Sequence, residues 1–228
     1  MLLAGELIFI RPAFAAEAPE RIPTIHEAAA SDALPDRHHI TIPTIDLSGE
    51  INPADFKRHV VLAQGTEEEN WQHPHMLLMP DGRTIFATWT LGHGGTCGYL
   101  KRSDDGGRTW SERLPTPQSW ATSREVPTIH RVVGPEGTKR LILWSGLYPA
   151  RLAVSEDDGR SWTELIPAGE WGGIVVMGFV EALKTGNGHY LAMFHDDGRF
   201  FTAKGTRSGT FKLYKTFSRD GGLTWSVP

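Results

Sequence analysis

The passage His195-Asp196-Asp197-Gly198-Arg199 places an imidazole, two carboxylates and a guanidinium within five residues. It follows an apolar stretch, so the acidic side chains emerge where a predicted strand ends. Asp196 or Asp197 could act as a general acid or base, and Arg199 could hold the carboxylate of a substrate. A β-turn built on the Asp-Gly pair explains the same residues equally well, and both interpretations stay open.

Other residues with similar chemistry lie where predicted strands begin or end. His73 and His75 are two apart in a predicted strand and therefore share one of its faces, while Arg124 and Glu125 precede a second strand. The candidate catalytic residues are Asp196, Asp197, Glu125 and His73. The candidate substrate-binding residues are Arg124, Arg199, His75, His93, Tyr148, Arg151 and His195, and Arg207 belongs to the same region. Cations, carboxylates and imidazoles in one region are typical of an active site.

The motif S-x-D-x-G-x-[ST]-W occurs three times, starting at Ser103, Ser155 and Ser218, so the copies begin 52 and 63 residues apart. A period near 50 residues is typical of propeller blades. In each copy, glycine supplies a position with positive φ, and the aspartate can accept backbone N–H bonds of a tight turn. The predicted structural residues are the aspartates Asp105, Asp157 and Asp220 and the tryptophans Trp110, Trp162 and Trp225, whose rings would pack on the blade.

The sequence around each motif predicts the same order of elements: strand, hairpin, strand, longer loop, strand, motif, strand. Four antiparallel strands per unit form a propeller blade. We therefore predict an all-β fold, with blades at about 70–115, 122–167 and 171–228. Three further tryptophans lie near the starts of blades: Trp71, Trp120 and Trp171. Each ring would either pack inside the fold or stack on a sugar ring.

These motifs resemble the Asp-box, or BNR, repeats of the sialidase (neuraminidase) superfamily, over residues 70–228. The resemblance implies a sialidase-like β-propeller, six-bladed in that family, of which about three blades are present here. An incomplete propeller exposes a sheet face and would be unstable or associate. Sialidases cleave terminal acidic sugars, holding the substrate carboxylate with three arginines and using an Asp as acid/base and a Tyr–Glu pair as nucleophile.

The chain departs from that pattern at the first blade. Its opening is Trp71-Gln72-His73-Pro74-His75, which has no arginine, and the loop 91–96 has His93 but no carboxylate. Arg124-Glu125-Val126-Pro127 is similar to a displaced Arg-x-Pro motif. Three functions follow: an exo-acting, sialidase-like glycoside hydrolase of a terminal acidic sugar, a polysaccharide lyase acting on uronates, and a propeller that binds sugars without catalysis. We favour the first, so we expect an enzyme with a glycan substrate.

Composition and short motifs indicate which partners, cofactors and disulfides are not expected. Net charge is −4 and no Lys/Arg run occurs, so nucleic acid is not an expected partner. No phosphate loop, dinucleotide fingerprint or Cys/His zinc spacing is present in the sequence, so we expect neither a cofactor nor a metal. Cys97 is the single cysteine, which excludes an intramolecular disulfide.

The N-terminal sequence indicates export. The apolar run Leu7-Ile8-Phe9-Ile10 precedes Ala13-Phe14-Ala15, which fits a signal-peptide cleavage site. We predict a signal remnant at 1–16, an extension at 17–69, and a secreted or periplasmic protein. No stretch reaches the roughly 18 apolar residues of a transmembrane helix.

Overall fold

The computed structural model describes residues 59–228, apart from the side chains of residues 175–177. The predicted signal remnant 1–16 and residues 17–58 of the predicted extension lie outside this part. The described residues belong to one structural unit, Ile40–Pro228. Across residues 59–228, no helix is long and apolar enough to cross a membrane.

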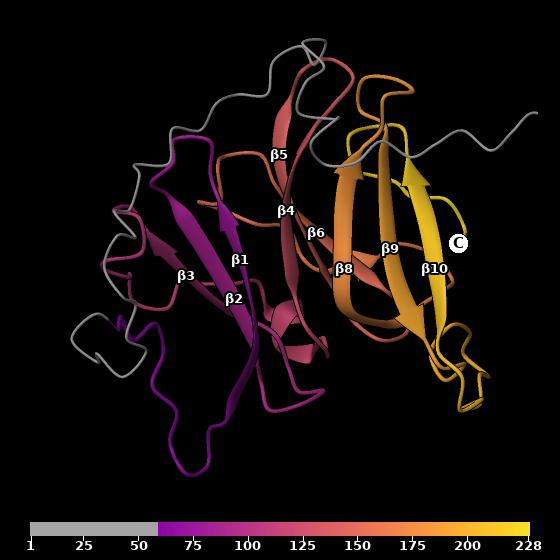
Figure 1. The fold of residues 1–228 in the computed structure, drawn as a ribbon, viewed down its shortest axis with the longest axis horizontal. Coiled ribbons are helices and arrows are strands. Elements are labelled where there is room, and N and C mark those ends of the chain that lie inside the picture. The colour runs from indigo at the N-terminus through magenta and orange to yellow at the C-terminus, as the bar shows by residue number, and fades with distance from the viewer. Residues whose placement is uncertain (1–58) are drawn as a thin grey trace, which may run out of the picture. The chain divides into compact units, whose positions relative to one another are not determined.

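The described part of the chain is built from antiparallel sheets and one 3₁₀ helix, Gln118–Thr122 (Figure 1). Blade 1 contains β1 (Trp71–Leu78), β2 (Ile85–Leu91) and β3 (Tyr99–Ser103); blade 2 contains β4 (Thr128–Val133), β5 (Lys139–Ser145), β6 (Arg151–Ser155) and β7 (Ile166–Pro167); blade 3 contains β8 (Ile174–Ala182), β9 (Tyr190–Asp196) and β10 (Lys212–Ser218). Within each blade, strands adjacent in the chain pair with one another. The all-β prediction is therefore confirmed.

Among residues 59–228, a fourth strand occurs in blade 2 alone, and it is two residues long. In blade 2 it is β7, which pairs with β6. In blade 1, the Ser111 N–H donates to the Arg102 carbonyl at 2.8 Å, and in blade 3 the Ser226 N–H donates to the Phe217 carbonyl at 2.8 Å. The residue after the motif tryptophan therefore begins the same pairing in each blade, but full fourth strands do not develop in blades 1 and 3.

Blade 2 packs on both of its neighbours, and β5 shows how. Successive side chains of a strand point to opposite faces. Leu141 and Leu143 join a core with Phe86 of blade 1, whereas Ile142 and Trp144 join a core with Phe194 of blade 3. Because both faces of β5 are covered, its sequence is a continuous apolar run.

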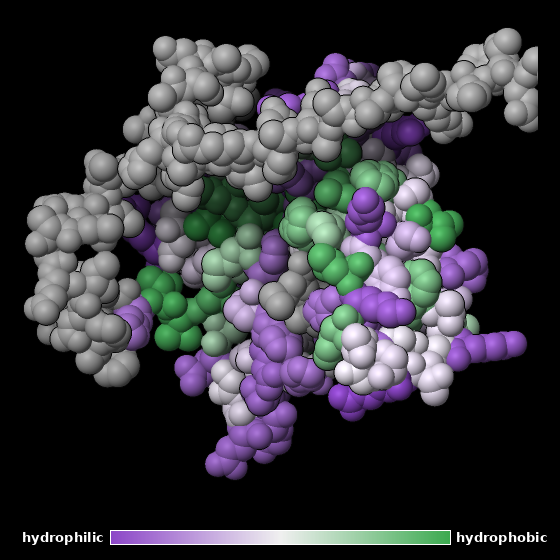
Figure 2. Space-filling model, turned by 45° about the vertical axis from the view of Figure 1, so that its right-hand side comes forward, coloured by the Kyte–Doolittle hydropathy of each residue, from purple (hydrophilic) through white to green (hydrophobic). Residues whose placement is uncertain are grey.

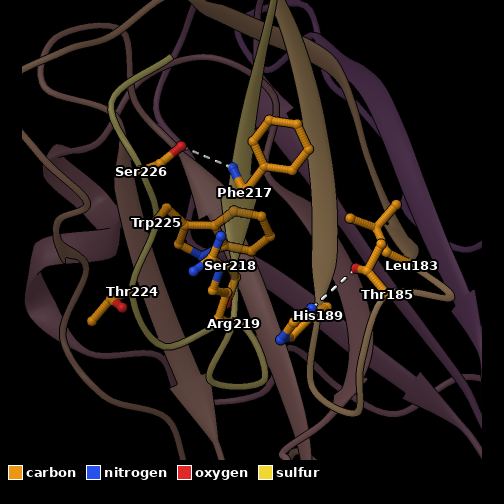
Figure 3. A pocket seen from close by; sticks show the side chains of 9 residues that line it. All are labelled: Leu183, Thr185, His189, Phe217, Ser218, Arg219, Thr224, Trp225 and Ser226. Atoms are coloured by element: carbon orange, nitrogen blue, oxygen red, sulfur yellow. Dashed lines mark hydrogen bonds between the residues drawn. The ribbon is translucent and has the colours of Figure 1, made fainter.

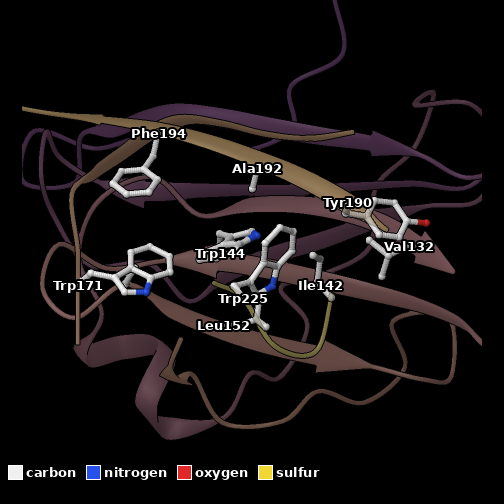
Figure 4. Packing of buried hydrophobic residues seen from close by; sticks show 10 residues of the cluster. Val132, Ile142, Trp144, Leu152, Trp171, Tyr190, Ala192, Phe194 and Trp225 are labelled. Carbon is white, nitrogen blue, oxygen red and sulfur yellow. The ribbon is translucent and has the colours of Figure 1, made fainter. Parts of the chain in front are cut away.

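The core between blades 2 and 3 contains ten buried residues, shown in Figure 4. Trp225 lies in it, with its ring centroid 5.0 Å from that of Trp144 in an edge-to-face arrangement. Trp171 stacks on Phe194 at 5.2 Å. Burial of large rings is the main favourable term in such a core, so the third motif contributes directly to holding two blades together.

The other predicted tryptophans differ in burial. Trp162 is half-buried and meets the buried Trp120 edge-to-face at 5.3 Å, whereas Trp110 is half-buried and belongs to neither core. Trp71 is half-buried and donates its Nε1–H to the Gln64 carbonyl at 2.9 Å. Trp120 and Trp171 are packed inside the fold, so neither presents a ring to a sugar.

The first strand of each blade lies on the inside of the arrangement. β4 contacts both β1 and β8, and β1, β4 and β8 each begin a blade (Figure 1). Sheets arranged side by side around their first strands are the architecture of a β-propeller. The described residues therefore form part of a propeller, with three blades.

One face of blade 3 does not pack on blade 2. Tyr190, Ala192 and Phe194 of β9 point into the shared core, so the intervening residues point to the opposite face. Leu213 is 67% exposed and Phe217 is 39% exposed on that opposite face. In Figure 2, where this side of the molecule comes forward, hydrophobic and charged side chains are interspersed.

Candidate functional site

The loops at one end of the blades are joined to each other through the backbone. Thr96 forms a bridge with Arg124, and the Gly146 N–H donates to the Arg124 carbonyl at 2.9 Å. The Gly173 N–H donates to the Leu147 carbonyl at 2.7 Å. These bonds connect loop 92–98 of blade 1 to loop 146–150 of blade 2 and onward to blade 3. We call this end of the blades the mouth.

A pocket of about 240 Å³ opens at the mouth beside blade 2. Arg124, Tyr148 and Arg151 line it together with Phe200, which reaches it from blade 3. Two arginines and two aromatic residues therefore line one concave site. Guanidinium forks match carboxylates, and aromatic faces pack against sugar rings.

Tyr148 is held in this pocket as a neutral phenol. Its hydroxyl lies 3.3 Å from Glu170 Oε2, to which it donates a hydrogen bond. Desolvation, followed by the negative charge of Glu170, raises the pKa of Tyr148 above its usual value. The side chain is therefore suited to donating a hydrogen bond and to stacking rather than to acting as a phenolate.

The carboxylate of Asp197 is paired with two arginines. Its Oδ1 accepts a hydrogen bond from Arg199 Nε at 2.7 Å, and its Oδ2 lies 3.4 Å from Arg207 Nε. The bond to Arg199 is the main cause that lowers the pKa of Asp197. The Arg199 guanidinium lies 5.0 Å from the centroid of Phe200, so this ion pair adjoins the pocket.

Asp196 is fully buried and serves the turn that follows β9. Its Oδ2 accepts N–H bonds from Gly198 at 2.7 Å, Phe200 at 3.2 Å and Phe201 at 3.1 Å. A carboxylate that closes a turn in this way has few remaining lone pairs for a substrate. The two adjacent aspartates thus hold different parts of the same loop.

Glu125 is a buried carboxylate at the start of blade 2, with 7% of its surface exposed. Its backbone is in the left-handed region, with φ at 66°, and its N–H donates to the Gly95 carbonyl at 3.0 Å. Its Oε2 has no hydrogen-bond partner among the described residues. The carboxylate lies against loop 92–98, the segment in which the sialidase resemblance places an acidic residue.

His73 and His93 meet at the same side of the mouth, with ring centroids 5.0 Å apart. His73 has φ at 50°, and its buried Nδ1 has no hydrogen-bond partner among the described residues. His75 lies elsewhere: its Nδ1 accepts the Ile129 N–H at 3.2 Å, and its ring is 5.3 Å from that of His130 on β4. His195 contacts Phe211 at 5.4 Å, on the face of β9 that does not pack on blade 2.

The motif aspartates lie at the other end of the blades, because Ser103 pairs with Ile85 at the beginning of β2. Each accepts the hydroxyl and N–H groups of its own turn; Asp157 Oδ2, for example, accepts the Ser161 hydroxyl at 2.6 Å. That hydroxyl bond is the main cause that lowers the pKa of Asp157 to about 2. The structure therefore shows these carboxylates bonded within turns and away from the mouth.

A wider cavity, of about 810 Å³, lies at that same end of blade 3 (Figure 3). His189, Phe217 and Arg219 contribute to its wall, and the Thr185 hydroxyl lies 3.0 Å from His189 Nδ1. Arg219 is the single arginine in its lining, whereas two arginines line the pocket at the mouth. The wider cavity therefore lacks the pair of arginines that the pocket at the mouth offers.

Two residues of functional interest escaped the sequence analysis. Phe200 follows the predicted acidic passage, but only the turn held by Asp196 brings its ring to the pocket of blade 2. His130 lies within a strand, where alternation alone does not distinguish it from a surface residue; burial lowers its pKa to about 3. No group of three or more potential metal ligands occurs among residues 59–228.

Comparison with known proteins finds a solved structure with a similar fold. No protein-family model matches the chain, and no curated protein sequence matches it. A solved structure of an α-L-arabinanase from Penicillium chrysogenum, in complex with arabinobiose, is similar with a TM-score of 0.50 and 18% sequence identity. The match covers 73% of this chain and 52% of the arabinanase, so the chain spans about half the length of that protein.

At this level of identity the similarity concerns the fold. It supports the propeller architecture that the repeated motifs predict, in line with the three blades described above. It does not support the finer assignment to sialidases, which stays a resemblance of the repeated motif. A shared fold does not determine function, so the chemistry of the site depends on its own residues.

Proposed function

We propose that this protein is a glycoside hydrolase that binds an acidic sugar of a glycan at the mouth of its propeller. The observation that carries the proposal is the pocket in which Arg124 and Arg151 meet the rings of Tyr148 and Phe200. A carboxylated sugar presents both of the surfaces that these residues recognise: an anion for the guanidinium groups and a ring face for the aromatic groups.

The size of the pocket supports a terminal sugar. At about 240 Å³ it is smaller than the usual range of about 300–1,000 Å³ for drug-sized ligands. One sugar ring suits this space better than a polysaccharide segment, which favours exo-acting cleavage. The arabinanase with the same fold binds arabinobiose, so this architecture holds a sugar in that protein. Export, which the N-terminal sequence predicts, would bring the protein to extracellular glycans.

The direct test is activity of the full 228-residue chain on three probes: an aryl sialoside, an aryl glucuronide and a uronic-acid polysaccharide. We expect release of the aryl group or of a reducing sugar from at least one of them. Arg124→Ala with Arg151→Ala should raise KM strongly, because both pocket cations are removed. Arg160→Ala is the matched control, since Arg160 is exposed in the second motif, at the other end of blade 2.

A polysaccharide lyase is the second candidate, and the contact between His73 and His93 favours it. An imidazole with an unpartnered nitrogen, such as Nδ1 of His73, can abstract the proton beside a uronate carboxylate. Lysis would give an unsaturated product that absorbs in the ultraviolet and no new reducing end from water. Binding of the probes without either product would instead identify a sugar-binding propeller, and absence of both binding and turnover would contradict the proposal.

A further inference from the structure

Three buried polar atoms at the mouth have no hydrogen-bond partner among the described residues: His73 Nδ1, Glu125 Oε2 and Asp197 Oδ2. Such atoms are costly to bury, because they lose water without gaining a bond. Asp197 Oδ2 is compensated by Arg207 Nε at 3.4 Å. Among the ion pairs of residues 59–228, none includes Glu125. Glu125 is therefore the buried carboxylate whose oxygen is left without a partner.

The fold holds Glu125 in this position by several constraints. Its φ of 66° lies in the left-handed region, where a non-glycine residue is strained and persists only when its surroundings hold it. Its N–H is bonded to Gly95, and a Cβ on Gly94 would lie 3.0 Å from Glu125 Oε1. Gly94 itself has φ at 69°, which favours glycine. Loop 92–98 thus leaves room for the carboxylate at Gly94.

The neighbouring aspartates are engaged elsewhere. Asp196 closes the turn after β9 with three backbone N–H groups, and Asp197 is bonded to Arg199. Glu125 nevertheless belongs to the same electrostatic environment, since its charge contributes to raising the pKa of Arg199, after the larger effects of the Asp197 bond and of the Asp197 and Asp196 charges. Of the three carboxylates, Glu125 is the one with capacity to exchange a proton with a substrate.

We propose that Glu125 is the catalytic residue that transfers the proton during cleavage of the acidic sugar, an inference that rests on the proposed function. As a carboxylic acid, Glu125 donates its proton to the glycosidic oxygen while the bond between that oxygen and the anomeric carbon breaks. The leaving sugar departs as an alcohol. A water molecule then adds its oxygen to the anomeric carbon, and its proton returns to the Glu125 carboxylate, which regenerates the acid.

The location of Glu125 suits this role. It adjoins Arg124, a residue that lines the sugar pocket, so one backbone segment carries both the anchoring cation and the proton donor. Two of the three non-glycine residues with positive φ among residues 59–228, His73 and Glu125, lie at the mouth. Strained backbone that is fixed by its surroundings is common where a side chain must be aimed at a substrate.

The test is Glu125→Gln in the full chain, which keeps size and burial but cannot transfer a proton. On the probe that the wild type cleaves, kcat should fall by at least about 100-fold while KM stays within a few-fold. The loss should shrink for aryl glycosides with strongly acidic leaving groups, and the limb of the pH–rate profile that depends on Glu125 should disappear. Glu112→Gln, at an exposed glutamate of blade 1, is the matched control.

Gly94→Ala provides a second variant, because its methyl group would displace the carboxylate without removing it. Its kcat should fall while the thermal midpoint shows that the chain is folded. If the wild type cleaves a probe and Glu125→Gln retains its kcat and pH profile, the role of Glu125 is wrong and the proposed function stands. If the wild type cleaves none of the probes, both proposals are overturned.

Discussion

Asp197 Oδ1 lies 2.7 Å from Arg199 Nε, and the carboxylate has no exposed surface although the guanidinium side chain is 42% exposed. A covered anion thus anchors a solvent-facing cation. Because Arg199 lies against Phe200, the ion pair also fixes one wall of the pocket at the mouth. Under the proposed function, Asp197 is therefore a positioning residue for the binding of the acidic sugar.

The first prediction concerns Asp197→Asn, which keeps the shape of the side chain and removes its charge. Arg199 and Arg207 should then lose their fixed orientation, and KM for the acidic sugar should rise on the order of tenfold with a smaller change in kcat. Asp104→Asn is the control, because Arg102 Nε also lies 2.7 Å from Asp104 Oδ1, but in the first motif. An equal change of KM in both variants would contradict the positioning role.

The second prediction concerns the motif of blade 3. Asp220 accepts the N–H groups of Leu223 and Thr224 at 3.1 and 3.0 Å, together with the hydroxyl of Ser218 at 2.8 Å. Asp220→Ala should lower the free energy of unfolding by about 1–3 kcal/mol, since these donors lose their acceptor next to the buried Trp225. Denaturant unfolding measures this. Asp220→Asn retains one acceptor oxygen and should cost less, and Arg219→Ala, at a variable position of the motif, should cost little.

Much of this fold could be predicted because the motif determines its own turn. In each copy, the side chains of the serine and the aspartate bond to groups within the same eight positions, so their pattern in the sequence is sufficient to predict the turn. The burial of the tryptophans could not be predicted in the same way. Trp225 is buried because Trp144 of another blade covers it, whereas Trp110 belongs to neither core of residues 59–228.

Only part of the candidate site could be predicted from the sequence. Arg124, Tyr148 and Arg151 share a pocket because each lies at a strand end on the same side of blade 2, which the order of elements implies. The separate roles of Asp196 and Asp197 depend on the path of the chain after β9. His195 faces away from the pocket because it follows the buried Phe194 in a strand, and alternation sends it to the other face.

The third prediction concerns pH and the pair His75 and His130. Burial, and then the neighbouring His75, lowers the pKa of His130 to about 3, and burial also lowers the pKa of His75. The neutral forms are favoured in the folded protein, so their stabilisation is fully present above the unfolded pKa of about 6.5 and is lost as the pH falls below it. Stability should decline between about pH 6.5 and 3, by up to about 1.4 kcal/mol per pH unit for each proton taken up.

Denaturant midpoints measured across that range test the pair. His130→Gln removes one titrating imidazole and should flatten the decline, even if its stability at neutral pH is lower. His189→Gln is the control, because His189 lies in the exposed turn of blade 3 and bonds to Thr185. An identical slope in the wild type and His130→Gln would show that other groups govern the acid sensitivity.

The fourth prediction concerns the face of blade 3 that does not pack on blade 2. In blade 3, Leu191 pairs with Phe217, the residue before the motif serine. In blade 2, Ile142 pairs with Val154, which also comes directly before the motif serine. Leu191 and Ile142 therefore occupy equivalent positions. Ile142 is completely buried by blade 3, whereas Leu191 is only half-buried. The same positions that form a core in blade 2 are thus accessible in blade 3.

An accessible sheet face of this composition should make the 228-residue chain self-associate, with an apparent mass that rises with concentration in sedimentation velocity. Leu213→Lys introduces a charge at the most exposed large hydrophobic residue of β10 on this face and should reduce the association. Ile166→Lys is the matched control, because Ile166 is 60% exposed but belongs to β7 of blade 2. If both variants associate like the wild type, the contact lies elsewhere on the molecule, and a monomeric wild type at all concentrations would contradict the prediction itself.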